Sequence, residues 1–125
     1  MTATVAITQI GQIAITVQDL ARAVAFYRDV LGLNLLFQAP PGLAFFQCGE
    51  VRLMLSPPEG IAGQAMTVLY YKVPDIHQAY QALQAHAVNF MDEPHLVAKL
   101  PDHELWMFFC HDSEGNTIAL MAELR

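Results

Sequence analysis

Polar and apolar residues alternate along the first part of the chain as they do in a half-buried β-strand. The alternation runs from Gln9 to Val17 and predicts a strand with one packed face. Apolar residues then recur at helical spacing from Leu20, with Asp19 placed to cap the helix and Gly32 placed to end it. After this helix the pattern predicts three short strands, separated by turns that contain Pro or Gly: Asn34 to Gln38, Leu43 to Cys48 and Val51 to Ser56.

The second half of the chain repeats the first. One offset, 56 residues, separates Val17 from Val73 and Asp19 from Asp75, and in both copies a strand-like run precedes the acid and a helical run follows it. The repeat predicts an α+β fold of two tandem βαβββ modules, residues 8–57 and 66–122, joined by a linker, residues 58–65, within a single domain, residues 1–125. The elements predicted for the second module are a strand from Met66 to Val73, a helix from Ile76 to Ala85, and strands from Val88 to Asp92, Leu105 to Cys110 and Thr117 to Met121.

One segment departs from the repeat. The pattern predicts a loop from Glu93 to Glu104, much longer than its counterpart from Pro40 to Gly42. Long loops in compact domains are often functional or mobile. We therefore expect this loop to close over a functional site or to supply residues to it.

Strand parity divides each predicted sheet into an apolar face and a mixed face. The apolar faces, with Ile13, Ile15 and Val17 on the first strand, are expected to carry the helices, and the mixed faces to look across a concavity. Mostly apolar walls with a few polar groups are typical of a small-molecule site. The alternative is that the mixed faces meet solvent or a second subunit. The predicted pocket residues are Gln12, Arg52, Met54, Tyr70 and Ala119, with Trp106 as a flat wall, although parity stays open for the strands Leu43 to Cys48 and Leu105 to Cys110.

Composition narrows the class of protein. The 125 residues are 54% hydrophobic and 14% charged, which is enough apolar material for a core. The net charge is −6 and the six Lys and Arg are scattered, so we expect no nucleic-acid partner, and no apolar run is long enough to predict a membrane partner. Cys48 and Cys110, with no secretory signal at the N-terminus, favour a cytoplasmic location. Glycine-rich phosphate loops, nucleophile elbows and paired-cysteine zinc motifs are absent from the sequence.

Both ends of the chain carry motifs of a known superfamily. Residues 10–33 combine the first strand with the helical sequence AFYRDVLGL, and residues 109–120 read FCHDSEGNTIAL. These motifs resemble the vicinal oxygen chelate superfamily, which includes glyoxalase I, methylmalonyl-CoA epimerase, extradiol dioxygenases, and bleomycin and fosfomycin resistance proteins. The resemblance implies the glyoxalase/bleomycin resistance fold, in which curved mixed sheets enclose a pocket. It also implies a homodimer, since the modules of this superfamily pair either within a chain or across chains.

The same resemblance implies four metal-ligand positions on the inward faces. The metal-dependent members place His, Gln or Glu there, and the cation polarises vicinal oxygens of the substrate. In this chain only one of the four positions offers an oxygen donor, so we expect no intrinsic metal and no cofactor, as in the metal-free branch that bleomycin-binding proteins typify. The four degenerate positions hold Gln12, Met54, Val68 and Ala119.

Three residues of the long loop remain candidates for chemistry. His95, His103 and Glu104 could join Gln12 in a displaced divalent-metal site, or either histidine could act as a metal-free acid or base. Loop histidines with acids nearby are, however, more often structural groups held by hydrogen bonds. Arg52 is the candidate anchor for a carboxylate or phosphate, unless its guanidinium only extends to the rim of the pocket.

The sequence thus predicts a small-molecule-binding cytoplasmic protein, related to glyoxalases and bleomycin resistance proteins, with no intrinsic metal. The alternative is a lyase, isomerase or dioxygenase of the same superfamily that uses a displaced metal or a loop histidine, so enzyme status stays open. A third class, a structural or partner-binding module, would require an exposed apolar patch. The sequence does not predict the identity of the ligand.

Overall fold

The structure is a computed structural model that describes residues 6–58 and 67–125. Most of the predicted linker, and Met66 at the start of a predicted strand, lie outside the described residues. The first module contains β1 (Gln12–Thr16), α1 (Leu20–Ala25), the π-helix η1 (Phe26–Val30), β2 (Asn34–Ala39), β3 (Leu43–Cys48) and β4 (Val51–Ser56). The second contains β5 (Leu69–Lys72), α2 (Ile76–Gln84), β6 (Asn89–Phe90), β7 (His95–Lys99), β8 (Glu104–His111) and β9 (Thr117–Leu124).

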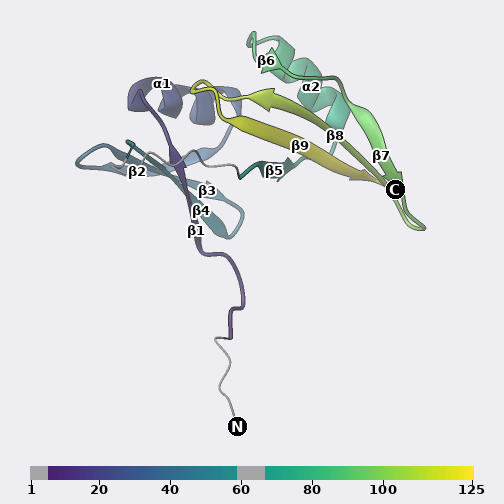
Figure 1. The fold of residues 1–125 in the computed structure, drawn as a ribbon, viewed down its shortest axis with the longest axis horizontal. Helices are drawn as coiled ribbons and strands as arrows, with labels where there is room; N and C mark the ends of the chain where they lie inside the picture. The colour runs from purple at the N-terminus through teal and green to yellow at the C-terminus, as the bar shows by residue number, and fades with distance from the viewer. Residues whose placement is uncertain (1–5, 59–66) are drawn as a thin grey trace.

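Each module forms one mixed sheet, and the two sheets share a topology. The first sheet has the order β1-β4-β3-β2, with β1 and β4 parallel and the other pairs antiparallel. In the second sheet β5 pairs with β9 in parallel, β9 with β8, and β8 with both β6 and β7. The sheets lie side by side, with α1 and α2 on the same side of the molecule (Figure 1). The predicted α+β fold of two repeated modules is confirmed.

The segment predicted as a long loop is the main correction to the secondary structure. It contains β7, which pairs with β8 and has a bulge between Leu96 and Ala98. β6 and β7 together occupy the edge position that β2 holds in the first sheet, and Asp92 bridges the break between them by accepting a 2.7 Å hydrogen bond from the backbone N–H of Phe109. The bulge and the flanking Pro94 and Pro101 explain why the sequence suggested a loop, because they obscure the alternation.

The first helix also differs from its prediction. Asp19 caps α1 as expected, with its carboxylate accepting from the N–H of Arg22 at 3.1 Å, and Asp75 caps α2 in the same way. The predicted continuous helix turns π-helical after Ala25, and the N–H of Leu31 donates to the carbonyl of Phe26, five residues earlier. Gly32 then ends the helix with a φ of 76°, a conformation that favours glycine.

Each module has one apolar cluster, which packs its helix against its own sheet. Three residues contact both clusters. Phe46 and Leu55 are fully buried beneath α1, and Ile76 and Phe108 are fully buried beneath α2. Burial of each such side chain contributes about 1.5–3 kcal/mol. The residues that pack against both clusters are Phe26, Leu31 and Tyr71. The modules therefore share a continuous apolar junction on their helical side.

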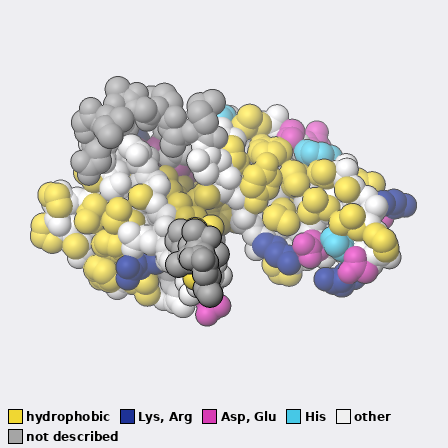
Figure 2. Space-filling view, turned by 60° about the horizontal axis from the view of Figure 1, so that its bottom comes forward, with side chains coloured by type: hydrophobic (Ala, Val, Ile, Leu, Met, Phe, Trp, Pro, Cys, Tyr) yellow, Lys and Arg dark blue, Asp and Glu magenta, His cyan; other side chains and the backbone are white. Residues whose placement is uncertain are grey.

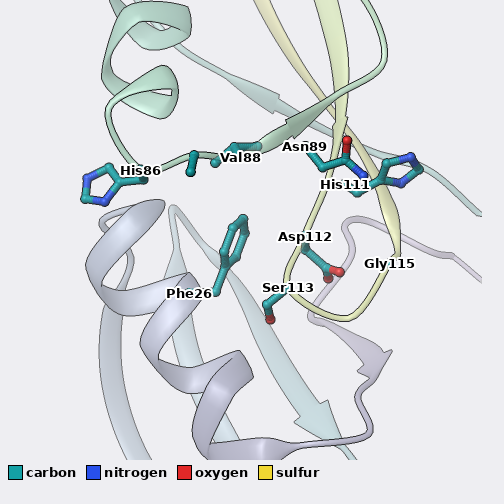
Figure 3. Close-up of a pocket in the computed structure, with 9 residues that line it drawn as sticks. Phe26, His86, Val88, Asn89, His111, Asp112, Ser113 and Gly115 are labelled. Carbon is teal, nitrogen blue, oxygen red and sulfur yellow. The ribbon is translucent and has the colours of Figure 1, made fainter.

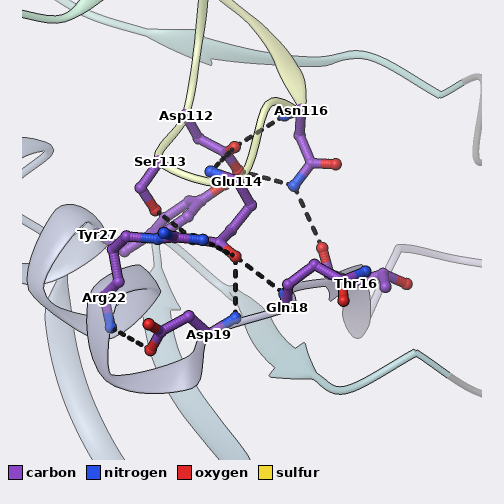
Figure 4. Close-up of polar contacts among 9 residues, drawn as sticks. All are labelled: Thr16, Gln18, Asp19, Arg22, Tyr27, Asp112, Ser113, Glu114 and Asn116. Atoms are coloured by element: carbon purple, nitrogen blue, oxygen red, sulfur yellow. Dashed lines mark hydrogen bonds and ion pairs between the residues drawn. The ribbon is translucent and has the colours of Figure 1, made fainter.

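A polar network locks this junction, and we call it the latch: Asp112, Glu114 and Asn116 of the β8–β9 turn with Thr16, Gln18, Asp19, Arg22 and Tyr27 of the first module (Figure 4). The buried Asp112 accepts a 2.6 Å hydrogen bond from the hydroxyl of Tyr27 and also holds the backbone N–H groups of its own turn. The amide of Asn116 donates to the carbonyl of Thr16 at 3.2 Å. The family-like motif at residues 112–116 thus ties the second module to the first.

Glu114 carries the ionic part of the latch. Its carboxylate accepts two hydrogen bonds from the guanidinium of Arg22, the shorter 2.7 Å, and one from each backbone N–H of Gln18 and Asp19 at 2.9 Å. The Glu114 side chain is only 1% exposed. The guanidinium of Arg22 and these backbone donors lower the pKa of Glu114 to about 2, so it stays ionised in the folded protein.

Candidate functional site

The sheet faces turned away from the helices form the candidate site, and we call them the open faces. On the first module, the neighbouring residues Ile13 of β1 and Leu53 of β4 pack into the core beneath α1. The residues at alternate positions therefore point to the open face: Gln12, Arg52 and Met54. Figure 2 brings this side of the molecule forward, and shows hydrophobic side chains over much of it, with charged groups gathered at the far end of the second module. The strand parity expected from the sequence therefore holds for β1 and β4.

Three of the predicted pocket residues contact one another on the first open face. The Nε of Arg52 donates to the Oε1 of Gln12 at 2.7 Å. The amide nitrogen of Gln12 lies 3.9 Å from the sulfur of Met54. The Gln12 side chain is thus bound through its oxygen to a cation and through its nitrogen to a thioether.

Aromatic rings extend this group across the same face. Ala44 and Phe46 of β3 are fully buried in the core, so Phe45 between them lies on the open face, which settles the parity that the sequence left open. Its ring lies 5.4 Å below the guanidinium carbon of Arg52 and stacks on Phe37 of β2, with centroids 4.5 Å apart. Phe37 is not among the pocket residues predicted from the sequence. The bulge in β2 between Leu35 and Phe37 hides this position, because it shifts the parity of the strand.

The second open face carries two more of the predicted residues. Tyr70 is 50% exposed, and its ring meets that of Phe109 edge-on at 5.8 Å. Ala119 pairs in register with both Tyr70 and Phe109 and is fully buried. At the far end of this face Lys72 pairs with Glu123 at 3.2 Å.

Trp106 is the one predicted pocket residue that lies elsewhere. It packs with the core beneath α2, where its ring meets His77 edge-on at 5.4 Å, and its Nε1 donates to Glu104 at 3.0 Å. Trp106 pairs with the buried Ala122, whereas the open face takes the alternate positions of β8. The expectation that Trp106 shares a face with Tyr70 is corrected by this parity, which the sequence left open.

The candidates for loop chemistry lie in the β7–β8 hairpin, at the end of the second sheet distant from the first (Figure 1). The Nδ1 of His95 lies 2.9 Å from the carbonyl oxygen of Glu93, and that of His103 lies 2.8 Å from a carboxylate oxygen of Asp102. Glu104 accepts from Trp106 and lies 3.8 Å from the ammonium of Lys99. Each of the three groups has a local partner, and no contact joins any of them to Gln12.

The four family metal-ligand positions do not fit a divalent cation. Val68 and Ala119 have no donor atom, and Met54 offers only a thioether, a soft ligand that hard cations avoid. The one oxygen donor, on Gln12, accepts from Arg52. Within residues 6–58 and 67–125, no group of three or more His, Cys, Asp or Glu side chains is arranged to hold a metal ion.

A separate open cavity of about 520 Å³ lies on the helical side, where the two modules meet. Phe26 points into it, while the imidazoles of His86 and His111 point away from it on opposite sides (Figure 3). Ser113 donates to Glu114 and Asp112 belongs to the latch, so the lining offers no nucleophile paired with a free base. This cavity was not predicted from the sequence, although Phe26 and the residues of the β8–β9 turn that line it belong to the two family-like motifs. Its lining residues are Phe26, His86, Ala87, Val88, Asn89, His111, Asp112, Ser113 and Gly115.

Neither cysteine suggests nucleophilic chemistry. Cys48 and Cys110 are unpaired, and Cys110 is fully buried. Burial raises the pKa of the Cys110 thiol to about 11, so the thiol is protonated at neutral pH. As for membranes, none of the helices in the described part of the chain has the length and apolar character needed to span one.

Comparisons with known proteins agree with this architecture. The model of the family described as the Glyoxalase/Bleomycin resistance protein/Dioxygenase superfamily matches residues 9–120. Similar solved structures include a member of this superfamily from Sphaerobacter thermophilus DSM 20745, with a TM-score of 0.77, 20% identity, and 94% of this chain and 98% of that chain covered. No curated protein matches the chain significantly.

Two further similar structures are those of an enzyme and of a binding protein. Lactoylglutathione lyase from Agrobacterium tumefaciens aligns with a TM-score of 0.73 and 23% identity, over 94% of this chain and 95% of that one. The antibiotic-binding protein TnmS3 from Streptomyces sp. CB03234 aligns with a TM-score of 0.75 and 23% identity, over 96% and 99%. At these identities the likeness shows a common fold.

Proposed function

Because the chain belongs to the Glyoxalase/Bleomycin resistance protein/Dioxygenase superfamily, we propose that it binds a small organic molecule at its open faces without an intrinsic metal. The faces combine exposed aromatic rings, methionine and a few polar groups, which is the usual lining of a small-molecule site. The likeness to TnmS3, an antibiotic-binding protein, supports binding as the function. We place this binder in the cytoplasm, since both of its cysteines are free thiols.

One contact carries the metal-free part of the proposal. Arg52 donates to the only oxygen among the four family ligand positions, at 2.7 Å, and so holds a positive charge where a cation would have to sit. Two like charges a few ångströms apart repel each other, and the remaining positions offer no oxygen or imidazole to compensate. Arg52 and the four family ligand positions therefore favour a neutral or anionic ligand over a metal ion.

We further propose that the binding cavity is closed by a second copy of the chain. The latch joins the two modules (Figure 4), and both open faces lie on the side of the molecule away from the helices, so neither face covers the other (Figure 1). Phe37 is 48% and Tyr70 is 50% exposed in the single chain. An antiparallel homodimer would bring the first open face of one copy against the second open face of its partner, and would bury these rings around a ligand.

The alternative is an enzyme of the same superfamily, a lyase, isomerase or dioxygenase. The observation in its favour is the likeness to lactoylglutathione lyase. The candidate acid/base residues speak against it, because His95 and His103 lie in the β7–β8 hairpin, each beside its own local partner. Catalysis would then need either a displaced metal or a movement of this hairpin towards Gln12.

The test combines ligand screening with metal analysis on the full chain. A panel of aromatic and apolar compounds should raise the unfolding temperature by about 5 °C for a binder present at about ten times its Kd. Tyr70→Ala should abolish the shift, and Gln81→Ala, on the exposed side of α2, should leave it intact. Retention of near-stoichiometric transition metal, lost on replacing His95 or His103 by Ala, would contradict the metal-free proposal.

A further inference from the structure

Arg52 differs from the other five Lys and Arg residues of the chain. The sequence contains six Lys and Arg residues, and five of them lie within 4.0 Å of a carboxylate oxygen. Within the part of the chain that the structure describes, Arg52 has no such partner. The five paired residues are Arg22 with Glu114, Arg28 with Asp29, Lys72 with Glu123, Lys99 with Glu104, and Arg125 with Asp102.

The surroundings of Arg52 hold its guanidinium in place without neutralising it. Gln12 accepts from its Nε at 2.7 Å, and the ring of Phe45 lies 5.4 Å from its central carbon. These contacts use the Nε and one flat side of the guanidinium. Its two terminal nitrogens, the pair that binds a carboxylate in bidentate fashion, donate to no group among the described residues.

The electrostatics of this sheet favour an anion. The chain carries a net charge of −6, yet β1, β2, β3 and β4 together contain no Asp or Glu. Arg52 is their only charged residue. On an otherwise acidic protein, the four strands of the first sheet thus carry one positive charge and no negative one, and the nearest acid along the chain, Glu50, lies in the exposed β3–β4 turn.

We propose that Arg52 binds the carboxylate of a planar aromatic acid, whose ring packs on Phe37 and Phe45. This inference rests on the proposed function and names the chemical class of its ligand. A carboxylate fits better than a phosphate, because one planar cation matches a single negative charge, whereas phosphate sites usually add backbone N–H groups or further basic residues. The stack of Phe37 on Phe45 offers a flat apolar surface beside the cation, 48% exposed at Phe37.

The test compares two probes of nearly the same shape, one anionic and one neutral. Calorimetric titration of the full chain with 1-naphthoate and with the neutral 1-naphthamide should show the acid binding at least about tenfold tighter, as expected for a charge-assisted bidentate contact. Arg52→Gln should reduce this ratio to about one, and Arg52→Lys should retain part of it. The matched control, Arg28→Gln, removes an exposed arginine on the helical side and should leave the ratio unchanged.

The outcomes separate this inference from the proposed function. Equal binding of the two probes to the wild-type protein, or an acid preference that survives Arg52→Gln, would overturn the role of Arg52 while leaving small-molecule binding in place. Displacement of 1-naphthoate by inorganic phosphate at a similar concentration would overturn the choice of a carboxylate. Failure of both probes to bind would overturn the aromatic-acid class, and the proposed function would then depend on the wider ligand panel.

Discussion

Arg22 and Arg52 belong to the same module, and their surroundings differ in a way that separates structure from function. Arg22 gives two hydrogen bonds to Glu114, a carboxylate that is 1% exposed and also accepts from two backbone N–H groups. Arg52 donates to a neutral amide and lies over a phenyl ring. The charge of Arg22 is neutralised within the fold, whereas the charge of Arg52 is available to bind an anionic ligand. The Arg22–Glu114 ion pair thus marks the junction between the modules, and the unpaired Arg52 marks the candidate site on the open face.

The largest expected effect comes from breaking the centre of the latch. Asp112→Ala should lower the free energy of unfolding by about 3 kcal/mol, because it leaves the buried hydroxyl of Tyr27 and the N–H groups of the β8–β9 turn without their acceptor. Urea unfolding followed by circular dichroism measures it. Asp29→Ala, which removes an exposed carboxylate, is the control and should cost under about 0.5 kcal/mol. Similar losses in the two variants would show that the latch does not stabilise the fold.

The latch should also give the protein a specific acid sensitivity. Glu114 has a pKa of about 2 in the folded protein against an ordinary 4.5, so protons bind the unfolded chain more tightly. The ionised Glu114 therefore stabilises the folded state fully above about pH 4.5, and this stabilisation is lost as the pH falls towards 2. The loss should be about 2 kcal/mol, a value reduced because solvent screens the half-exposed Arg22. Urea unfolding at a series of pH values from 2 to 6 measures this loss. The free energy of unfolding should depend less steeply on pH in Glu114→Gln than in the wild type. The same dependence of the free energy of unfolding on pH in both proteins would mean that Glu114 is not the titrating group.

An intermediate effect is expected at the open face. If a second copy covers this face, Phe37→Glu should weaken the dimer at least about tenfold, by placing a charge in an apolar interface. Sedimentation velocity over a concentration series measures this change. Gln81→Glu adds a charge on the exposed side of α2 and should leave the dimer intact. A wild-type protein that stays monomeric at high concentration would refute the pairing across chains.

The smallest effect should be the cost of losing Arg52 to the fold itself. Arg52→Gln is expected to change the free energy of unfolding by less than about 0.5 kcal/mol, because the exposed guanidinium has no carboxylate partner. Arg22→Gln should cost about 1–2 kcal/mol, since it strips two donors from the nearly buried Glu114. Equal costs in urea unfolding would remove the distinction between the two arginines.

Much of the fold follows from the sequence, because its periodicity is regular. The bounds of β3 and β4 match their predictions residue for residue, and Asp19 and Asp75 cap the two helices as their positions suggested. β7 was missed, since a bulge and two flanking prolines break its alternation. The π-helical turn after Ala25 leaves no signature in apolar spacing, because Tyr27 and Leu31 face the core in either helix type.

The candidate site was only partly accessible to the same reasoning. Parity placed Gln12, Arg52 and Met54 on one face, where the structure brings them into contact. Parity was ambiguous on β8, and Trp106 was therefore assigned to the wrong face. The lack of a carboxylate beside Arg52, and the role of residues 112–116 as a latch, depend on contacts between segments distant in sequence. Periodicity does not report such contacts.

The most direct test of metal-free binding at the open faces is a thermal-shift titration on chelator-treated protein, with the aromatic acid 1-naphthoate as ligand. We expect the unfolding temperature to rise with ligand concentration by the same amount before and after chelation, and Arg52→Gln to reduce the rise to that given by the neutral 1-naphthamide. A shift that disappears on chelation and returns when a divalent cation is added would contradict the proposal. That result would show that a metal ion, and not Arg52, holds the ligand.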